Sequence, residues 1–178
     1  MSHALTSHAA TAGDRPASLR HAVISGALAG QIAGLVMAVV VMAVFTLFLG
    51  KGPLYPVQVI GSLVFGDAAL DGIHVGAIAA GLLLHQLGPA LVWGIIFGLV
   101  VNRLDLRGAG LAVAAVATGV ASQLIDVGVL VPAAMKALHG HDIWAAEVPA
   151  FWSWAAHLVF GIALLSLPWV SRRIARSA

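Results

Sequence analysis

The sequence predicts an all-α integral membrane protein in which four transmembrane helices form an up-down bundle. Of its 178 residues, 61% are hydrophobic and 9% are charged, and the mean hydropathy is +1.01. A soluble domain averages about 25% charged residues, so this composition indicates a chain embedded in lipid. Four apolar runs are each long enough to cross a bilayer core of roughly 30 Å as a helix. The absence of cysteine excludes disulfides and thiolate metal sites.

The predicted elements follow one another in a single domain. Residues 1–20 are polar and lack the apolar core of a signal peptide, so we expect a disordered cytoplasmic tail there. The transmembrane domain is predicted over residues 21–171, and residues 172–178 form a short basic cytoplasmic tail. The four spans are expected at about 22–49, 75–101, 108–134 and 150–170.

A short apolar segment between the first two spans, about 56–65, is too short to cross the membrane. Pro56 suits the first turn of a helix, where the missing N–H costs nothing. Val57, Ile60 and Val64 then fall on one helical face, and Tyr55 is a typical interface residue. These features predict an interfacial helix in the outer leaflet. Trp144, Trp152 and Trp154 are expected near the same membrane surface, at the loop before the fourth span.

Basic residues predict the orientation of the spans. Seven of the nine lie on one side: Arg15, Arg20, Arg103, Arg107, Arg172, Arg173 and Arg176. Because basic loops stay in the cytoplasm, both termini are expected inside. The pI of 9.7 therefore reflects membrane topology, and nucleic acid is not an expected partner. The sequence contains no Walker loop, nucleophile elbow or zinc-protease motif.

Small residues at every fourth position predict close helix packing. Gly26, Gly30 and Gly34 share one face of the first span, and Gly94 and Gly98 share one face of the second. Such seams let backbones approach in lipid, where packing and hydrogen bonds drive helix association. The spacing leaves open whether the glycines pack within the bundle or remain exposed for a partner.

Polar residues inside three spans predict a shared layer. Counted at 1.5 Å per residue from the outer membrane surface, His85, Asp126 and His157 lie at about 15, 12 and 10 Å. Each belongs to a polar helical face; the further members of this network are Gln86, Ser122, Gln123 and Ser153. Gln31 lies near the cytoplasmic end of the first span, so we expect it to stay apart from the layer. Pro89 removes the hydrogen bond that the His85 carbonyl would accept, so that carbonyl needs another partner, such as Gln123, Ser122 or a water.

Several functions of this layer stay open. The polar residues could serve only as hydrogen-bonding contacts between helices. His85 and His157 could be the axial ligands of a b-type haem, with Lys51 or Lys136 near its propionates. Asp126 could belong to a proton relay, and the layer could line a quinone or lipid pocket. Separately, His139 and His141 in the loop before the fourth span could hold a metal ion, with His74 and Asp142 nearby.

Three stretches carry a family resemblance: the first span with its following KGPLYP turn, LLLHQLGPALVWGIIFGLVV, and WAAHLVFGIAL. Together they resemble a loosely defined group of small, uncharacterised four-helix bacterial inner-membrane proteins. The resemblance spans about residues 26–168 and implies a multi-pass protein of the bacterial inner membrane. It assigns no activity and no site residue.

The sequence favours a non-catalytic accessory or structural subunit of a larger, energy-transducing membrane complex. Short loops, missing catalytic motifs and the glycine seams support this reading, and imply other membrane subunits or a homo-oligomer as partners. The alternatives are a haem or redox protein that uses His85 and His157, and a proton-coupled transporter that uses Asp126.

Overall fold

The computed structural model describes residues 18–177, which form helices joined by short turns and contain no strand in that range. Four helical runs are long and apolar enough to cross a membrane: Leu19–Phe48, Val75–Arg103, Gly108–His139 and Ala150–Arg176. The prediction of an all-helical protein with four such runs is confirmed. The predicted N-terminal tail lies outside the described residues as far as residue 17.

Each predicted span begins close to its expected first residue, whereas two spans extend past their expected ends. The third run continues to His139, and the fourth continues through Arg172, Arg173 and Arg176, which the sequence reading places in a tail. The expected ends were placed where the apolar pattern stops. Backbone hydrogen bonding within a helix does not depend on that pattern, so the helices continue.

The first run is the unbroken helix α1 (Leu19–Phe48), whose N-terminus is capped by the Ser18 side chain. The other runs are divided into shorter elements, which are α3 (Val75–His85), η2 (Gln86–Ala90) and α4 (Leu91–Arg103); α5 (Gly108–Ser122), η3 (Gln123–Leu130) and α6 (Val131–His139); α8 (Ala150–Ala163), η4 (Leu164–Ser166) and α9 (Leu167–Ser177). The connections hold α2 (Tyr55–Phe65), η1 (Gly66–Leu70) and α7 (Ile143–Glu147).

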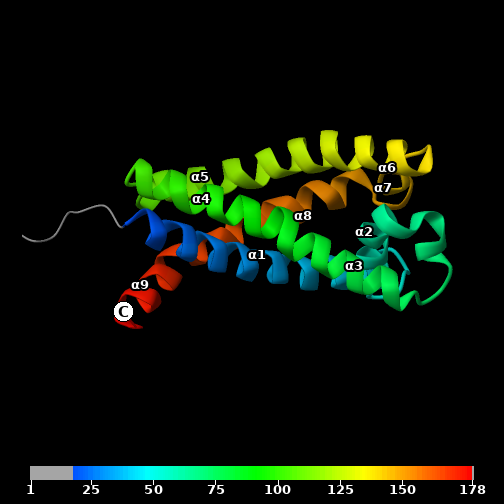
Figure 1. Cartoon of the computed structure of the whole chain (residues 1–178), viewed down its shortest axis with the longest axis horizontal. Coiled ribbons are helices and arrows are strands. Elements are labelled where there is room, and N and C mark those ends of the chain that lie inside the picture. Colours follow the sequence, from blue (N-terminus) through cyan, green and yellow to red (C-terminus); the bar gives the residue numbers. More distant parts are fainter. Residues whose placement is uncertain (1–17, 178) are drawn as a thin grey trace, which may run out of the picture.

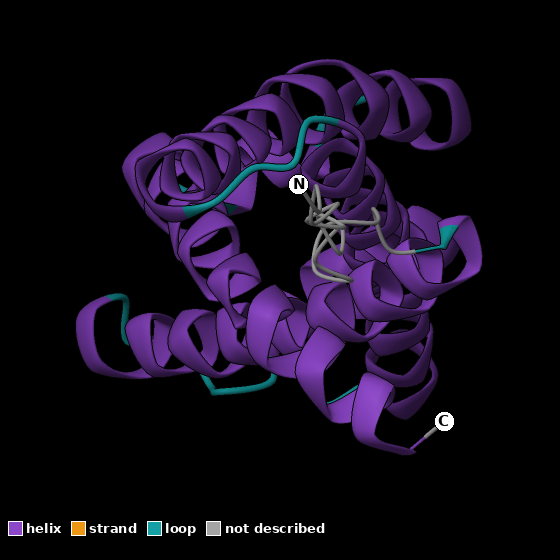
Figure 2. Cartoon of the chain, turned by 90° about the vertical axis from the view of Figure 1, so that its left-hand side faces the viewer, coloured by secondary structure: helices purple, strands orange, loops and turns teal. Residues whose placement is uncertain are grey.

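The two ends of the molecule differ in character (Figure 1). The start of α1, the α4–α5 turn and α9 lie together, and we call this the basic end because it carries Arg20, Arg103, Arg107 and Arg172. Helices α2 and α7 lie at the opposite end, which we call the loop end. Seen from the basic end, the helices surround a central axis (Figure 2).

The glycine seams of α1 and α4 pack against each other. A Cβ atom built on Gly26 would lie 2.5 Å from the Gly94 carbonyl oxygen, and one on Gly98 would lie 2.7 Å from the Gly26 Cα. Gly30 faces Ala90 and Gly94 just as closely, and Gly34 faces the Gln86 side chain. These backbones touch in a way that only glycine allows.

Two further glycine crossings hold the remaining helices. A Cβ on Gly119 of α5 would lie 2.5 Å from the His157 carbonyl oxygen of α8, and one on Gly161 would lie 2.5 Å from the Ala115 carbonyl oxygen. Between α2 and α3, Gly61 and Gly81 are equally close to the facing backbone. The sequence left open whether the seams of α1 and α4 pack within the bundle or against a partner; in the structure they pack against each other within the chain.

Two of the long runs open into π-helical turns beside prolines. Segment η2 contains Pro89, and Gly88 next to it has non-helical angles of φ −86° and ψ −107°. Segment η3 ends just before Pro132, which stands in the first turn of α6. Proline cannot donate the regular helical hydrogen bond and its ring crowds the preceding turn, so each run widens locally. Such widened turns are frequent at functional sites.

A short helix is present as α2 over Tyr55–Phe65, where the sequence predicts one at about 56–65, and it packs on α3. Buried Gln58 joins α2 to the segment that follows it, because its side-chain amide donates to the carbonyls of Ala69 in η1 (2.6 Å) and of Gly72 in the next turn (2.7 Å). A polar cluster joins α2 to α7: the Tyr55 hydroxyl donates to Glu147, and Lys51 lies 3.8 Å from the same carboxylate. Together α2 and α7 cover the loop end.

Candidate functional site: a cavity between the helices

A cavity of about 350 Å³ lies between the helices, and α2 and α7 form part of its wall on the side of the loop end. Its wall is largely apolar and is built from residues of α1, α2, α3, η2, α4, α5, η3, α6, α7 and α8. The polar side chains in the wall are His85, Ser122, Asp126, Ser153 and His157. The structure thus brings to one cavity the three ionisable residues that depth counting placed in a common layer.

Asp126 is held by an indole from the facing helix. The Trp93 Nε1–H group of α4 donates to Asp126 Oδ2 at 2.8 Å. Asp126 lies in the widened turn η3 and is only partly buried. Trp93 and Asp126 therefore link α4 and η3 across the cavity, and the second carboxylate oxygen has no hydrogen bond within residues 18–177.

His85 is tied to the first helix. Its Nε2 lies 3.1 Å from the Gly34 carbonyl oxygen, so this nitrogen carries the proton and donates. The other ring nitrogen, Nδ1, keeps its lone pair. Gly34 lacks a side chain and lies against η2, which lets the imidazole reach the α1 backbone.

A glutamine pair supports the opened turn beside His85. The Gln31 amide donates to the Gln86 carbonyl at 2.7 Å, and the Gln86 amide donates to the Gln31 carbonyl at 3.4 Å. The sequence reading expected Gln123, Ser122 or water to satisfy a carbonyl freed by Pro89. In the structure Gln31 donates instead to the Gln86 carbonyl, one residue later, which also accepts from the Leu91 backbone N–H.

His157 belongs to a second polar chain. Its Nδ1 lies 2.9 Å from the Ser153 carbonyl oxygen, so Nδ1–H donates and Nε2 keeps its lone pair. The Ser153 hydroxyl donates to Gln123 Oε1 at 2.9 Å, which joins α8 to η3. All three residues are buried, and His157 is 7% exposed. Ser122 donates within its own helix, to the Gly119 carbonyl oxygen.

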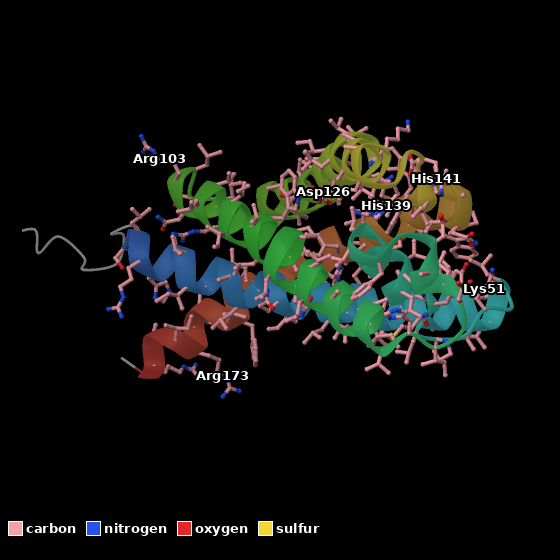
Figure 3. All side chains as sticks on the ribbon, turned by 45° about the vertical axis from the view of Figure 1, so that its right-hand side comes forward. Lys51, Arg103, Asp126, His139, His141 and Arg173 are labelled. Carbon is pink, nitrogen blue, oxygen red and sulfur yellow. The ribbon has the colours of Figure 1, made fainter. Side chains whose placement is uncertain are left out.

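Aromatic rings complete the wall, and its two histidines are not accompanied by any lysine or arginine among the described residues. Trp93, Trp144 and Trp152 line the cavity, and among the described residues that line it there is no lysine, arginine or glutamate. Figure 3 shows Asp126 in the middle of the molecule, with Arg103 and Arg173 toward one end and Lys51 toward the other. Asp126 therefore has no cationic side chain beside it in the part of the chain that the structure describes.

The haem hypothesis needs two imidazoles that present free nitrogens to one iron atom. His157 meets this need through Nε2, whereas His85 Nε2 is engaged with Gly34 and leaves only Nδ1. Lys51, suggested as a propionate partner, is bound at the loop end to Tyr55 and Glu147, and Lys136 is exposed. The arranged residues do not form a matched bis-histidine site.

The histidines of the loop end join backbone segments. His139 Nε2 donates to the Leu63 carbonyl at 3.2 Å. His141 contacts the His139 carbonyl and the Asp67 carboxylate, each through a different ring nitrogen, and Asp67 raises the pKa of His141. Nearby, His74 caps α3 and Asp142 caps α7. Within residues 18–177 no cluster of three metal-ligating side chains occurs, so the predicted metal role has no support here.

The sequence did not reveal two of the polar contacts, which are made by Trp93 and Gln31. It also placed Trp144 and Trp152 at the membrane surface and not at the cavity. Trp93 continues the four-residue spacing of Gly81, His85 and Pro89, which is the signal that could have revealed it. Gln31 was read as lying apart from the layer, although it contacts Gln86. Trp144 and Trp152 were assigned to the membrane surface, and both line the cavity because α7 folds over it.

Comparison of the chain with known proteins found no matching family model, no matching curated protein and no matching solved structure. The site must therefore be interpreted from its own geometry.

Proposed function

We propose that this protein is a multi-pass membrane protein that binds a small, largely apolar molecule with one polar group inside the bilayer. The cavity of about 350 Å³ carries this proposal. Ligand sites typically span about 300–1,000 Å³ and combine apolar walls with a few convergent polar groups. At about 30 Å³ per water-sized group, the space suits roughly a dozen non-hydrogen atoms.

The convergence of His85, Asp126 and His157 supports a ligand site over simple helix packing. Each comes from a different helical run, and each keeps at least one polar atom with no hydrogen bond within residues 18–177. Residues that serve only to join helices would satisfy each other. In lipid, unsatisfied polar atoms are costly, so those at a ligand site are completed by the ligand.

Photolabelling tests the proposal. The probe is phenylbutanol carrying a diazirine, with the full-length protein reconstituted in lipid nanodiscs. Ala155→Phe fills the cavity wall, whereas Ala117→Phe adds the same ring on an exposed face of α5. We expect labelling of cavity residues in the wild type and in Ala117→Phe, and its loss in Ala155→Phe. Even labelling of lipid-facing residues, unaffected by Ala155→Phe, would overturn the proposal.

We further propose that the spans form an up-down bundle in the bacterial inner membrane, with the basic end in the cytoplasm. The clustering of arginines at one end supports this orientation. The chain has no cysteine, so single cysteines can be introduced cleanly. A cysteine at Asp105 should react only after the membrane is permeabilised, and one at Gly52 should react in intact cells. The reverse pattern would refute the orientation.

The role of accessory subunit is a separate proposal. Its remaining grounds are the short loops and the missing catalytic motifs, since the glycine seams pack inside the chain. Purification in mild detergent tests it: stoichiometric partner chains would support it, and a stable, partner-free protein would count against it.

A further inference from the structure

We infer that the ligand of this cavity is a lipophilic organic cation, an amine or quaternary ammonium group with an apolar body, which is exchanged against a proton at Asp126. This inference rests on the proposed function and adds the chemical class of the ligand. Three observations carry it: the unused atoms of the polar layer, the charge of the wall, and its aromatic content.

Around Asp126, the N–H and O–H groups in the cavity wall already donate hydrogen bonds to the protein, and the atoms left without a hydrogen bond are acceptors. The N–H groups of Trp93, His85 and His157 all donate to protein oxygens. The hydroxyl groups of Ser122 and Ser153 do the same. Around Asp126, what remains toward a ligand is one oxygen of Asp126, Nδ1 of His85 and Nε2 of His157, whereas the indole N–H donors of Trp144 and Trp152 belong to the part of the wall built by α7 and the start of α8. Such a set favours a donor or a cation over a carbonyl group.

The charge of the wall distinguishes a cation from a neutral donor. Asp126 is the single acidic residue among the described residues of the wall, which include no lysine or arginine. An isolated carboxylate in an apolar site must be neutralised, either by a proton or by a bound cation. The two compete for the same group, so one proton leaves for each cation that binds. The other titratable groups that face the site are His85 from α3 and His157 from α8.

The aromatic wall suits the same ligand. Trp93, Trp144 and Trp152 all line the cavity, so its wall offers the flat aromatic surface that the apolar body of such a ligand needs. Trp144 and Trp152 lie toward the loop end, where they can cover the apolar body. Trp93 stands beside the carboxylate and orients it.

Competition against the photoprobe tests the inference. The competitors share one apolar body: phenylbutylamine, phenylbutyl trimethylammonium, phenylbutanol and phenylbutanone. We expect the two cations to displace the probe at concentrations at least about tenfold lower than the ketone. The affinity for phenylbutyl trimethylammonium should rise about tenfold for each unit increase in pH over the range in which Asp126 is protonated in the free protein, because binding releases one proton. The charge of the trimethylammonium group does not change with pH, so the pH dependence of binding must come from the protein.

Variants test whether the preference for cations and the pH dependence of binding come from the Asp126 carboxyl group. Asp126→Asn should remove both the preference for cations and the pH dependence, while phenylbutanol still labels the cavity. Asp105→Asn, at the basic end, is the charge-matched control and should keep both. His85→Gln and His157→Gln should keep the pH dependence. If Asp126→Asn fails to fold, Trp93→Phe provides the second test, because it frees both carboxylate oxygens and should retain cation binding.

Two results would overturn the inference: equal displacement by the ketone and the cations, or an unchanged preference in Asp126→Asn. Failure of the proposed function looks different, because then no competitor displaces the probe from the cavity.

Discussion

The backbone contact between α1 and α4 can be tested by one methyl group. In Gly94→Ala the new Cβ would lie 2.5 Å from the Gly26 carbonyl oxygen and 2.5 Å from the Gly30 Cα. Carbon atoms in ordinary contact are about 3.5–4.0 Å apart, so the helices must separate by about 1 Å. Gly110→Ala is the matched control, because its nearest neighbour would be the Leu106 Cδ2 atom at 3.6 Å.

The expected free-energy change follows from two opposing effects. Overpacking at a closely packed site costs about 1–3 kcal/mol. Replacing a helical glycine with alanine returns up to about 1 kcal/mol in either variant, through helix propensity. Gly94→Ala should therefore be about 1–3 kcal/mol less stable than Gly110→Ala. For a chain of this size that difference corresponds to about 2–12 °C in the unfolding temperature.

The assay is thermal unfolding of the full-length protein in mild detergent, followed by loss of the monodisperse peak. A second readout distinguishes internal packing from a partner interface. If the seam packs inside the chain, Gly94→Ala lowers the unfolding temperature and leaves the oligomeric state unchanged. Equal stability of the two variants, or a changed oligomeric state at unchanged stability, would refute the described contact.

Three further predictions concern the loop end. Burial and Glu147 raise the pKa of Tyr55 to about 12. Because Tyr55 is the single tyrosine in the sequence, the phenolate absorbance reports on this residue and should titrate near pH 12. In Glu147→Gln the midpoint should move toward pH 10. Because the folded protein holds this proton more tightly, its stability should fall between pH 10 and about 12, and Tyr55→Phe should remove that fall. The pKa of His141, raised by Asp67, should return toward its ordinary value in Asp67→Asn, as followed by its ring resonances in NMR.

The sequence predicted the helices well because their signal is local. Apolar run length decides whether a helix can cross a membrane, and Pro56 marks the start of α2 within one residue. The depth of His85, Asp126 and His157 follows from counting residues along each helix. All three line one cavity, although counting alone could not show which way each side chain points.

The partners of these residues depend on packing between helices, which the sequence pattern does not encode. Trp93 reaches Asp126 because α4 and η3 face each other across the cavity. His85 reaches the Gly34 carbonyl only because glycine lets η2 approach α1. The glycine spacing was visible, but choosing between an internal seam and a partner surface required the position of the facing backbone.

A crystal structure of the full-length protein with ring-brominated phenylbutylamine tests the central claim most directly. The bromine gives an anomalous signal whose position needs no interpretation of weak density. The account predicts a single peak inside the cavity near Trp144 and Trp152, with the ammonium group toward Asp126. Bromine peaks confined to the lipid-facing surface, with none inside the cavity, would contradict it.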